Sequence, residues 1–184
     1  MTINVLNILH DTTVDGPGFR TSIYCAGCRH QCAQCHNPQS WTFGSGTDMS
    51  TEDILQEIIS DPFADVTFTG GDPLYQAEAF AELAKLIKTH TKKSIWCYTG
   101  FTFEQLIKKE ECRELLLNID VLVDGPFIAS KRSEEALFRG STNQRILLSR
   151  ESIIAGKPIL WKEPNWDVWA PSHIIYYILP NFHM

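Results

Sequence analysis

The stretch DVTFTGGDPLYQAEAFAELAKLIKTHTKKSIWCYTG, residues 65–100, decides the fold class of this chain. It begins with a short β-rich run that stops at the glycines of residues 70–71, and it ends with a second β-rich run at residues 94–100. Between them lies a helical pattern, residues 75–90, whose apolar side chains fall on one face: Phe80, Leu83, Ala84 and Ile87. Strand, helix and strand in this order are typical of a parallel sheet with right-handed crossovers.

The same alternation extends on both sides of this unit. A strand is predicted over residues 20–26. A helix is predicted over residues 50–60, where Ser50 is a typical N-cap and acidic residues follow in the first turn. Further along, the pattern predicts a helix, a near-continuous apolar strand and two shorter strands, at residues 102–118, 119–127, 145–149 and 157–161. We therefore expect one α/β domain over residues 1–161, with about six strands.

Glycine-containing loops follow four of the predicted strands. They are the cysteine-rich loop after residue 26, Gly70–Gly71–Asp72, Thr99–Gly100 and Asp124–Gly125. Because the carboxyl ends of parallel strands meet at one edge of a sheet, these loops are expected to lie together. The sequence thus predicts a functional site at this edge.

The bulk composition restricts the class of protein. The chain has 184 residues, of which 43% are hydrophobic and 21% charged, so a globular domain with its own core is expected. The formal net charge of −6 gives no general attraction to nucleic acid or to an anionic membrane, and neither is an expected partner. The N-terminus lacks a cationic region before an apolar run, and no stretch reaches the length of a transmembrane helix. A cytoplasmic location, where thiols stay reduced, is therefore expected.

Four of the six cysteines crowd into CAGCRHQCAQCH, residues 25–36: they are Cys25, Cys28, Cys32 and Cys35. In a reducing compartment such a cluster indicates metal binding or redox chemistry rather than disulfides. A zinc site would pair two C-x2-C knuckles across a longer separation, and the ferredoxin spacing is C-x2-C-x2-C-x3-C. Cys25 is predicted to be the buried end of the preceding strand, which leaves the spacing C-x3-C-x2-C. A zinc site and a closed four-cysteine cluster remain alternatives.

The spacing of Cys28, Cys32 and Cys35 resembles the signature of the radical S-adenosylmethionine superfamily. The resemblance implies that these three cysteines hold a [4Fe–4S] cluster and leave one iron free to bind S-adenosylmethionine. It also implies that the reduced cluster donates an electron to the sulfonium, which yields methionine and a 5'-deoxyadenosyl radical. No catalytic side chain beyond the cluster ligands is expected.

The segment TGGDP, residues 69–73, resembles the superfamily's Gly-Gly-Glu motif, which holds the amino group of S-adenosylmethionine. Alone it is typical of a tight turn, but two glycines also let the backbone approach a ligand. Because Asp72 replaces the longer glutamate, we expect the backbone role to outweigh the side-chain role. The expected cofactor-binding residues are Gly70, Gly71, Asp72, Pro73, Thr99 and Asp124. Asp124 is also a candidate ligand for a monovalent cation near the cofactor.

Four longer motifs narrow the resemblance. They are DGPGFR at residues 15–20, CHNPQSW at 35–41, VLVDGPF at 121–127 and FRGSTNQR at 138–145. Together they resemble the activating proteins of anaerobic, class III, ribonucleotide reductases. The resemblance implies a compact partial (βα)6-type barrel and a protein substrate, the large reductase subunit, on which a glycyl radical forms. It also implies an external electron donor such as flavodoxin or ferredoxin.

Other functions remain open from the residues alone. They are activation of another glycyl-radical enzyme, a radical reaction on a small molecule of the deazapurine synthase type, and a non-enzymatic zinc or electron-transfer module. Arg139, Asn143 and Arg145 are candidates for binding the cofactor carboxylate or the reductase, or for surface ion pairs. An aromatic- and proline-rich extension without an assigned role follows at residues 162–184.

Overall fold

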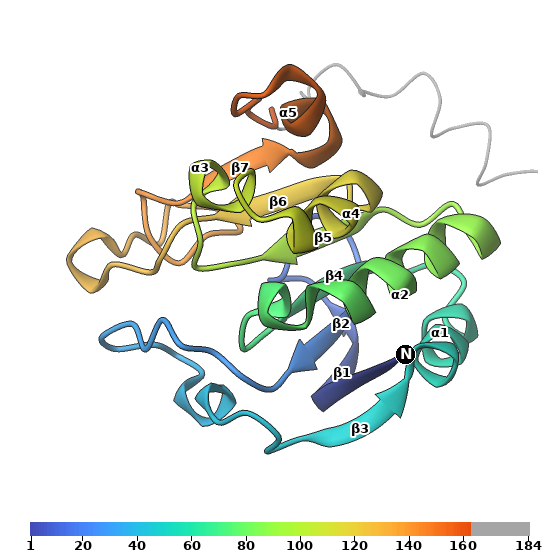
Figure 1. Ribbon diagram of the computed structural model, residues 1–184. Coiled ribbons are helices and arrows are strands. Elements are labelled where there is room, and N and C mark those ends of the chain that lie inside the picture. The colour runs from blue at the N-terminus through green and yellow to red at the C-terminus, as the bar shows by residue number, and fades with distance from the viewer. Residues whose placement is uncertain (163–184) are drawn as a thin grey trace, which may run out of the picture.

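The computed structural model describes residues 1–162, so the expected C-terminal extension lies outside the described residues from residue 163 onward. In this part of the chain, seven strands form one open sheet in the order β3-β1-β2-β4-β5-β6-β7 (Figure 1). The strands are β1 (Thr2–Thr12), β2 (Arg20–Cys25), β3 (Thr47–Ser50), β4 (Asp65–Gly70), β5 (Ile95–Tyr98), β6 (Val121–Asp124) and β7 (Arg145–Leu148). The helices are α1 (Thr51–Ser60), α2 (Ala77–His90), α3 (Phe103–Leu106), α4 (Glu110–Asn118) and α5 (Ser149–Ala155), with short 3-10 helices η1 (Pro38–Trp41), η2 (Pro73–Gln76) and η3 (Ala129–Lys131).

The four central strands are parallel, as the strand–helix–strand pattern predicts. β2 pairs with β4, β4 with β5 and β5 with β6, so all four strands end at the same edge. Both outer parts of the sheet are antiparallel: β1 pairs with β2 and β3, and β7 pairs with β6. The α/β class is confirmed, with a parallel centre inside a mixed sheet.

A row of helices covers one face of the sheet. α1, α2, α4 and α5 pack successively against one another (Figure 1). Ser50 caps α1 as predicted, because its hydroxyl oxygen accepts a hydrogen bond from the amide of Asp53 at 3.0 Å. Helix α2 buries its predicted stripe, and the ring centroid of Phe80 lies 4.8 Å from that of Phe68 in β4. None of the helices in residues 1–162 has the length and apolar character needed to cross a bilayer.

The opposite face of the sheet is covered by loops. A smaller apolar cluster lies there, formed by Trp96, Val121 and Val123, with Phe138 and Trp161 packed against it. Arg20 is fully buried on this face, where its guanidinium donates to the Thr67 hydroxyl and to the carbonyl of Pro17. Burial lowers the pKa of Arg20 to about 10. These bonds hold the turn of residues 15–18 against the sheet.

The prediction of a single helix over residues 102–118 is wrong, because the structure has two helices there, α3 and α4. Lys109 adopts an extended backbone conformation, with φ −110° and ψ 101°, and interrupts the helix. In one continuous helix, Leu106 and Leu115 would lie on opposite faces, because each residue advances the helix by about 100°. The break lets both side chains enter the core.

The strand predictions also differ from the structure at the two edges of the sheet. The sequence does not predict β1 and β3, which pair with each other. β7 forms where predicted but runs antiparallel, because its connection to β6, residues 125–144, contains only a short 3-10 helix and no crossover helix. The strand predicted over residues 157–161 reduces to one bridge between Leu147 and Leu160, because β7 ends at Leu148 and the amide of Ile159 donates to the Ser152 hydroxyl instead of to a strand.

Candidate cluster and cofactor site

The loops that follow β2, β4, β5 and β6 meet at one edge of the sheet, as the sequence predicts. They line a hollow of about 120 Å³. Its lining includes the loop cysteines and strand-end residues: Cys28, Cys32, Cys35, Gly70, Gly71, Asp72, Thr99, Gly100 and Gly125. The parallel order of the central strands thus gathers segments that lie far apart in the sequence.

The cysteines fall into two environments. Cys28, Cys32 and Cys35 lie on the loop after β2, partly exposed and with free thiols. Cys25 is fully buried at the end of β2, within the main core, and burial raises the pKa of its thiol. The remaining two cysteines, Cys97 and Cys112, are buried as well. Only the three loop cysteines line the hollow.

Hydrogen bonds tie the cysteine loop to the sheet. The amide of Gly27 donates to the carbonyl of Ser40 at 2.7 Å, which closes the loop on itself. The side chains of Asn37 and Ser40 both donate to the carbonyl of Gly70, each at 3.1 Å. The loop is therefore fastened directly to the end of β4.

Gly70 and Gly71 permit close backbone packing at this point. Gly70 has a φ of +96°, and a Cβ there would lie 2.6 Å from the backbone nitrogen of Cys25. A Cβ on Gly71 would lie 2.5 Å from the carbonyl oxygen of Gly27. The amide of Gly71 donates to the carbonyl of Cys25 at 2.7 Å. Side chains at either position would push the β4 end away from the start of the cysteine loop.

Asp72 is only 1% exposed, and its carboxylate accepts four hydrogen bonds. Oδ1 accepts from the amide of Leu74 at 3.0 Å, which caps η2. Oδ2 accepts from His30 Nε2 at 2.8 Å, from the Thr99 hydroxyl at 2.9 Å and from the Gly100 amide at 3.0 Å. The carboxylate therefore joins the cysteine loop to the ends of β4 and β5.

Thr99 and Pro73 lie differently with respect to the hollow. Thr99 lines it, and its hydroxyl oxygen also accepts from the amide of Phe101 at 3.1 Å. Pro73 is buried in the first turn of η2 and is not a lining residue. Of the predicted cofactor residues, the structure brings Gly70, Gly71, Asp72 and Thr99 to the three cysteines.

Asp124 does not line the hollow, because its carboxylate is paired across β6 and β7. Its Oδ1 accepts from Arg145 Nε at 3.0 Å, and its Oδ2 accepts from the amide of Phe103 at 2.7 Å. Arg145 also donates two hydrogen bonds to Glu104, at 3.0 and 2.9 Å. Arg145 lowers the pKa of Glu104 to about 2, while Asp124 and Glu104 raise the pKa of Arg145. Both predicted residues thus belong to an ion-pair network beside the site.

A second hollow, of about 510 Å³, adjoins the first. The two share five lining residues, namely His36, Thr69, Tyr98, Phe127 and Gln144. Residues 13–15 and several of residues 133–140 also line the larger hollow. The space beside the cysteines is therefore continuous with a wider opening on the loop-covered face.

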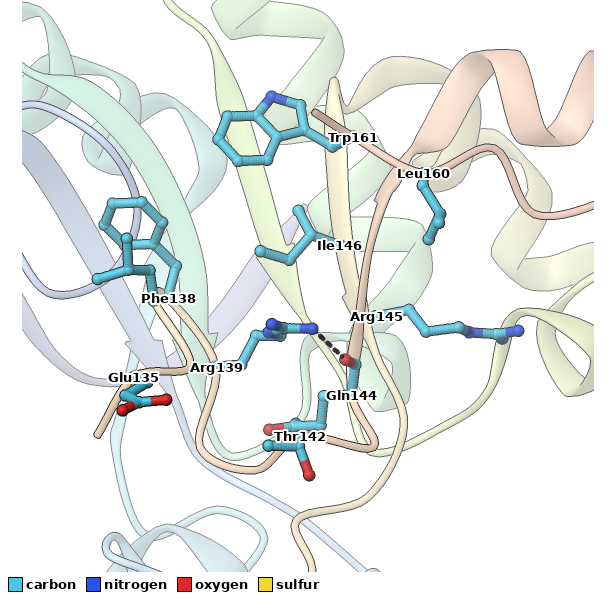
Figure 2. Close-up of a pocket in the computed structure, with 10 residues that line it drawn as sticks. Glu135, Phe138, Arg139, Thr142, Gln144, Arg145, Ile146, Leu160 and Trp161 are labelled. Atoms are coloured by element: carbon cyan, nitrogen blue, oxygen red, sulfur yellow. Dashed lines mark hydrogen bonds between the residues drawn. The ribbon is translucent and has the colours of Figure 1, made fainter. Parts of the chain in front are cut away.

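A third pocket, of about 520 Å³, lies along β7 (Figure 2). Arg139 and Arg145 line it, and the guanidinium of Arg139 donates to the carbonyl of Gln144 at 3.0 Å. Asn143 is outside this lining, and its amide nitrogen donates to the carbonyl of Pro126 at 2.8 Å. These three anion-binding candidates therefore make hydrogen bonds within the chain.

Sequence reasoning missed His30, and it placed Gly100 at this edge without giving it a role. His30 lies in the cysteine motif, and its ring contacts that of Phe101 edge-on, with centroids 4.5 Å apart. A Cβ on Gly100 would lie 2.4 Å from the His30 ring. The only signal in the sequence is the position of His30 between two cysteines, because its partners come from distant strands.

The residues around the hollow fit an iron–sulfur cluster. Three thiols line a space bounded by glycine backbone. Within residues 1–162, no three His, Cys, Asp or Glu side chains are grouped to hold one metal ion, so the three thiols are not drawn together around a single ion. Burial raises the pKa of Cys28, so binding a cluster must displace its proton.

Comparison with known proteins agrees with this site. A family model described as "4Fe-4S single cluster domain" matches residues 14–147. Three relatives share the name anaerobic ribonucleoside-triphosphate reductase-activating protein. The one from Haemophilus influenzae is 32% identical over 154 residues, covering 78% of this chain and 97% of the relative. Those from Vibrio cholerae and Enterobacteria phage T4 are 37% and 31% identical, covering 72% and 76% of this chain and 90% of each relative.

Among solved structures, QueE from Escherichia coli aligns with a TM-score of 0.47 and 21% identity, covering 55% of this chain and 54% of QueE. The sequence relatives match over a greater length and at higher identity. They and the family model together show that this chain belongs to the family of anaerobic ribonucleoside-triphosphate reductase-activating proteins.

Proposed function

We propose that this protein is a radical S-adenosylmethionine enzyme that forms the glycyl radical of an anaerobic ribonucleotide reductase. It cleaves S-adenosylmethionine reductively to a 5'-deoxyadenosyl radical, which takes a hydrogen atom from a glycine of the large reductase subunit. The observation that carries the proposal is the meeting of the three-cysteine loop with Gly70 and Gly71 at one edge of the parallel sheet. The proposal is supported by the relatives, which are named as activating proteins of anaerobic ribonucleoside-triphosphate reductase.

In this proposal, Cys28, Cys32 and Cys35 hold a [4Fe–4S] cluster and leave one iron for the cofactor. The cluster, when bound and reduced, supplies the electron for cleavage. The protein's own contribution is positioning. Hydrogen bonds from Asn37 and Ser40 to Gly70 keep the cysteine loop at a fixed place beside the end of β4.

The predicted cofactor residues take two kinds of role in the proposal. Gly70, Gly71 and Thr99 form the binding surface, because they line the hollow next to the cysteines. Pro73 acts indirectly, by starting η2 behind that surface. A monovalent cation at Asp124 would replace the Arg145 guanidinium that occupies this carboxylate. Comparing cofactor cleavage in sodium, potassium and a bulky organic cation tests for such an ion.

The partial barrel of about six strand–helix units also belongs to the proposal. Its wall would be the parallel strands β2, β4, β5 and β6, and its interior the face that carries Arg20 and Trp96. Residues 1–161 would form this catalytic domain, and the remaining residues an extension. The hollow of about 510 Å³ beside the cysteines would receive the glycine-bearing segment of the reductase. The partner would also keep water and oxygen from the radical.

The electron donor is proposed to be an external protein such as flavodoxin or ferredoxin. The enzyme would work in the cytoplasm, where its thiols stay reduced and free to bind iron. The cluster hollow has a volume of only about 120 Å³, so a partner would be needed to enclose the site. A protein substrate would meet this need.

The test is anaerobic reconstitution of the full chain with iron and sulfide, followed by reduction and addition of S-adenosylmethionine. Formation of 5'-deoxyadenosine is measured with and without the reductase, and the glycyl radical is detected by electron paramagnetic resonance. We expect cleavage, and a glycyl signal only when the reductase is present. Cys32→Ser is the matched control and should give neither. A wild-type chain that binds zinc instead of iron and cleaves nothing would contradict the proposal.

A further inference from the structure

We infer that Asp72 is a positioning residue that fixes the cysteine loop through His30, and that its carboxylate does not bind the ammonium group of the cofactor. The inference rests on the proposed function, because it concerns how the loop presents Cys28 and Cys32 to a cluster. The motif that TGGDP resembles gives the acid at this position a direct role in holding the cofactor. The hydrogen bonds of Asp72 give it a different one.

The Asp72 carboxylate leaves little room for a ligand. Three donors converge on Oδ2, while Oδ1 accepts from the amide of Leu74 and keeps one of its two acceptor positions. The side chain is 1% exposed, so a ligand would first have to displace a protein donor. A cofactor ammonium group would compete with His30, Thr99 and Gly100 at Oδ2.

The His30 ring is fitted into a specific slot. It meets the ring of Phe101 at 76° with centroids 4.5 Å apart, and the ring of Tyr75 lies 5.8 Å away. Gly100 forms the floor of the slot, since a Cβ there would come within 2.4 Å of the imidazole. Nε2 is the donor in the 2.8 Å bond, because an ionised carboxylate can only accept.

This slot controls the part of the loop that carries two cluster ligands. His30 lies midway between Cys28 and Cys32, so fixing its ring fixes the backbone on both sides. Asp72 holds the loop at a second point, because its amide donates to the carbonyl of Gly27 at 2.9 Å. Partners that orient metal ligands in this way typically change metal affinity by about 10–100-fold when removed.

The experiment compares four reconstituted full-length proteins: wild type, His30→Ala, Asp72→Asn and the double variant. A chelator challenge measures the half-life of the cluster from its visible absorbance. Electron paramagnetic resonance of the reduced cluster, with and without S-adenosylmethionine, measures cofactor binding. Gln31→Ala is the matched control, because Gln31 is the exposed neighbour on the same loop. Thermal unfolding of each apo-protein shows whether the fold is retained.

We expect His30→Ala and Asp72→Asn to shorten the cluster half-life roughly 10–100-fold, and the double variant to match either single one. His30→Gln, which keeps a donor for Asp72, should recover most of the half-life, and Gln31→Ala should match wild type. In variants whose cluster stays intact, the concentration of S-adenosylmethionine that gives half of the full spectral change should stay within about threefold of the wild-type value. A threefold difference corresponds to about 0.7 kcal/mol of binding free energy.

Gly100→Ala provides a second approach that leaves both hydrogen-bonding residues unchanged. Its methyl group should displace the His30 ring and shorten the cluster half-life as His30→Ala does. The inference is overturned if the half-lives of His30→Ala and Gly100→Ala equal that of wild type, or if Asp72→Asn weakens only cofactor binding. Failure of the proposed function is distinct from this, because wild type itself would then assemble no cluster or cleave no cofactor.

Discussion

Two sets of cysteines in this protein show how the surroundings decide what a side chain can do. Cys25, Cys97 and Cys112 are at most 1% exposed, among apolar residues, and burial raises the pKa of each, to about 11 for Cys112. Cys28, Cys32 and Cys35 lie on a loop at the sheet edge and line a hollow. Cys25 and Cys28 are three residues apart, yet one belongs to the core and the other to the site. Burial raises the pKa of Cys28 as well, so the difference between the two sets is access to the hollow and not the pKa of the thiol.

The two regions are also held together by different forces. The core under the helices is stabilised by apolar packing of β4 and β5 against α2 and α4. The cysteine loop is held by glycines that allow close backbone contact and by hydrogen bonds to Gly70 and Asp72. Substitutions should therefore separate loss of the cluster from loss of the fold.

The largest effect is expected from serine in place of Cys28, Cys32 or Cys35. Each substitution removes one of the three proposed ligands, so the cluster and all cofactor cleavage should be lost. The apo-protein should keep its free energy of unfolding to within about 0.5 kcal/mol, because these side chains lie outside the core. Iron content and urea unfolding measure the two quantities. A variant that kept its full iron content would show that its cysteine is not a ligand.

Phe68→Ala should destabilise the fold and leave iron binding unchanged. The side chain is fully buried against Phe80, so its removal should lower the free energy of unfolding by about 3–5 kcal/mol. Molecules that remain folded should still bind iron with wild-type stoichiometry, because the loop contacts are unchanged. Unfolding curves and iron analysis of the folded fraction check this. Complete loss of iron from folded protein would argue against the independence of the two regions.

Gly70→Ala tests the point where the core meets the cysteine loop. Its left-handed backbone should cost roughly 1–3 kcal/mol of stability, and its Cβ would press on the backbone of Cys25. Because the same residue anchors Asn37 and Ser40, the cluster half-life should fall as well. Denaturant unfolding and a chelator challenge measure both losses. Gly44→Ala is a control for the backbone effect alone, since its φ is +73° and its Cβ would meet nothing within 4 Å.

Cys25→Ala should have the smallest effect. It removes one buried sulfur from the core and should cost about 1 kcal/mol. Iron content, cluster spectrum and cofactor cleavage should equal those of wild type. Loss of the cluster in this variant would mean that Cys25 is a fourth ligand and that the site is closed.

The centre of the fold was predictable because its signals are local. Apolar periodicity and the glycine stop at residues 70–71 are sufficient to locate β4, α2 and β5. The edges of the sheet were less predictable from the sequence. β1 and β3 depend on each other for pairing, and the direction of β7 depends on a connection that contains no crossover helix. The break at Lys109 depends on where the core lies, which the sequence pattern alone does not specify.

The site also combines features that the local sequence indicates with features that it does not. The spacing of Cys28, Cys32 and Cys35 is a local signal, and their shared place at the hollow follows from parallel strands. The bond between His30 and Asp72 joins residues 42 positions apart, so no local pattern indicates it. Asp124 is the last residue of β6, at the edge where it was expected, but its ion pair with Arg145 depends on the antiparallel direction of β7.

The most direct test of the central claim is Mössbauer spectroscopy of the full-length protein, reconstituted anaerobically with iron-57, before and after addition of S-adenosylmethionine. If Cys28, Cys32 and Cys35 hold a four-iron cluster with one open position, the parameters of one iron in four should change when the cofactor binds. Cys25→Ala should give the same result. Four irons that are unaffected by the cofactor, or a cluster that requires Cys25, would contradict the account.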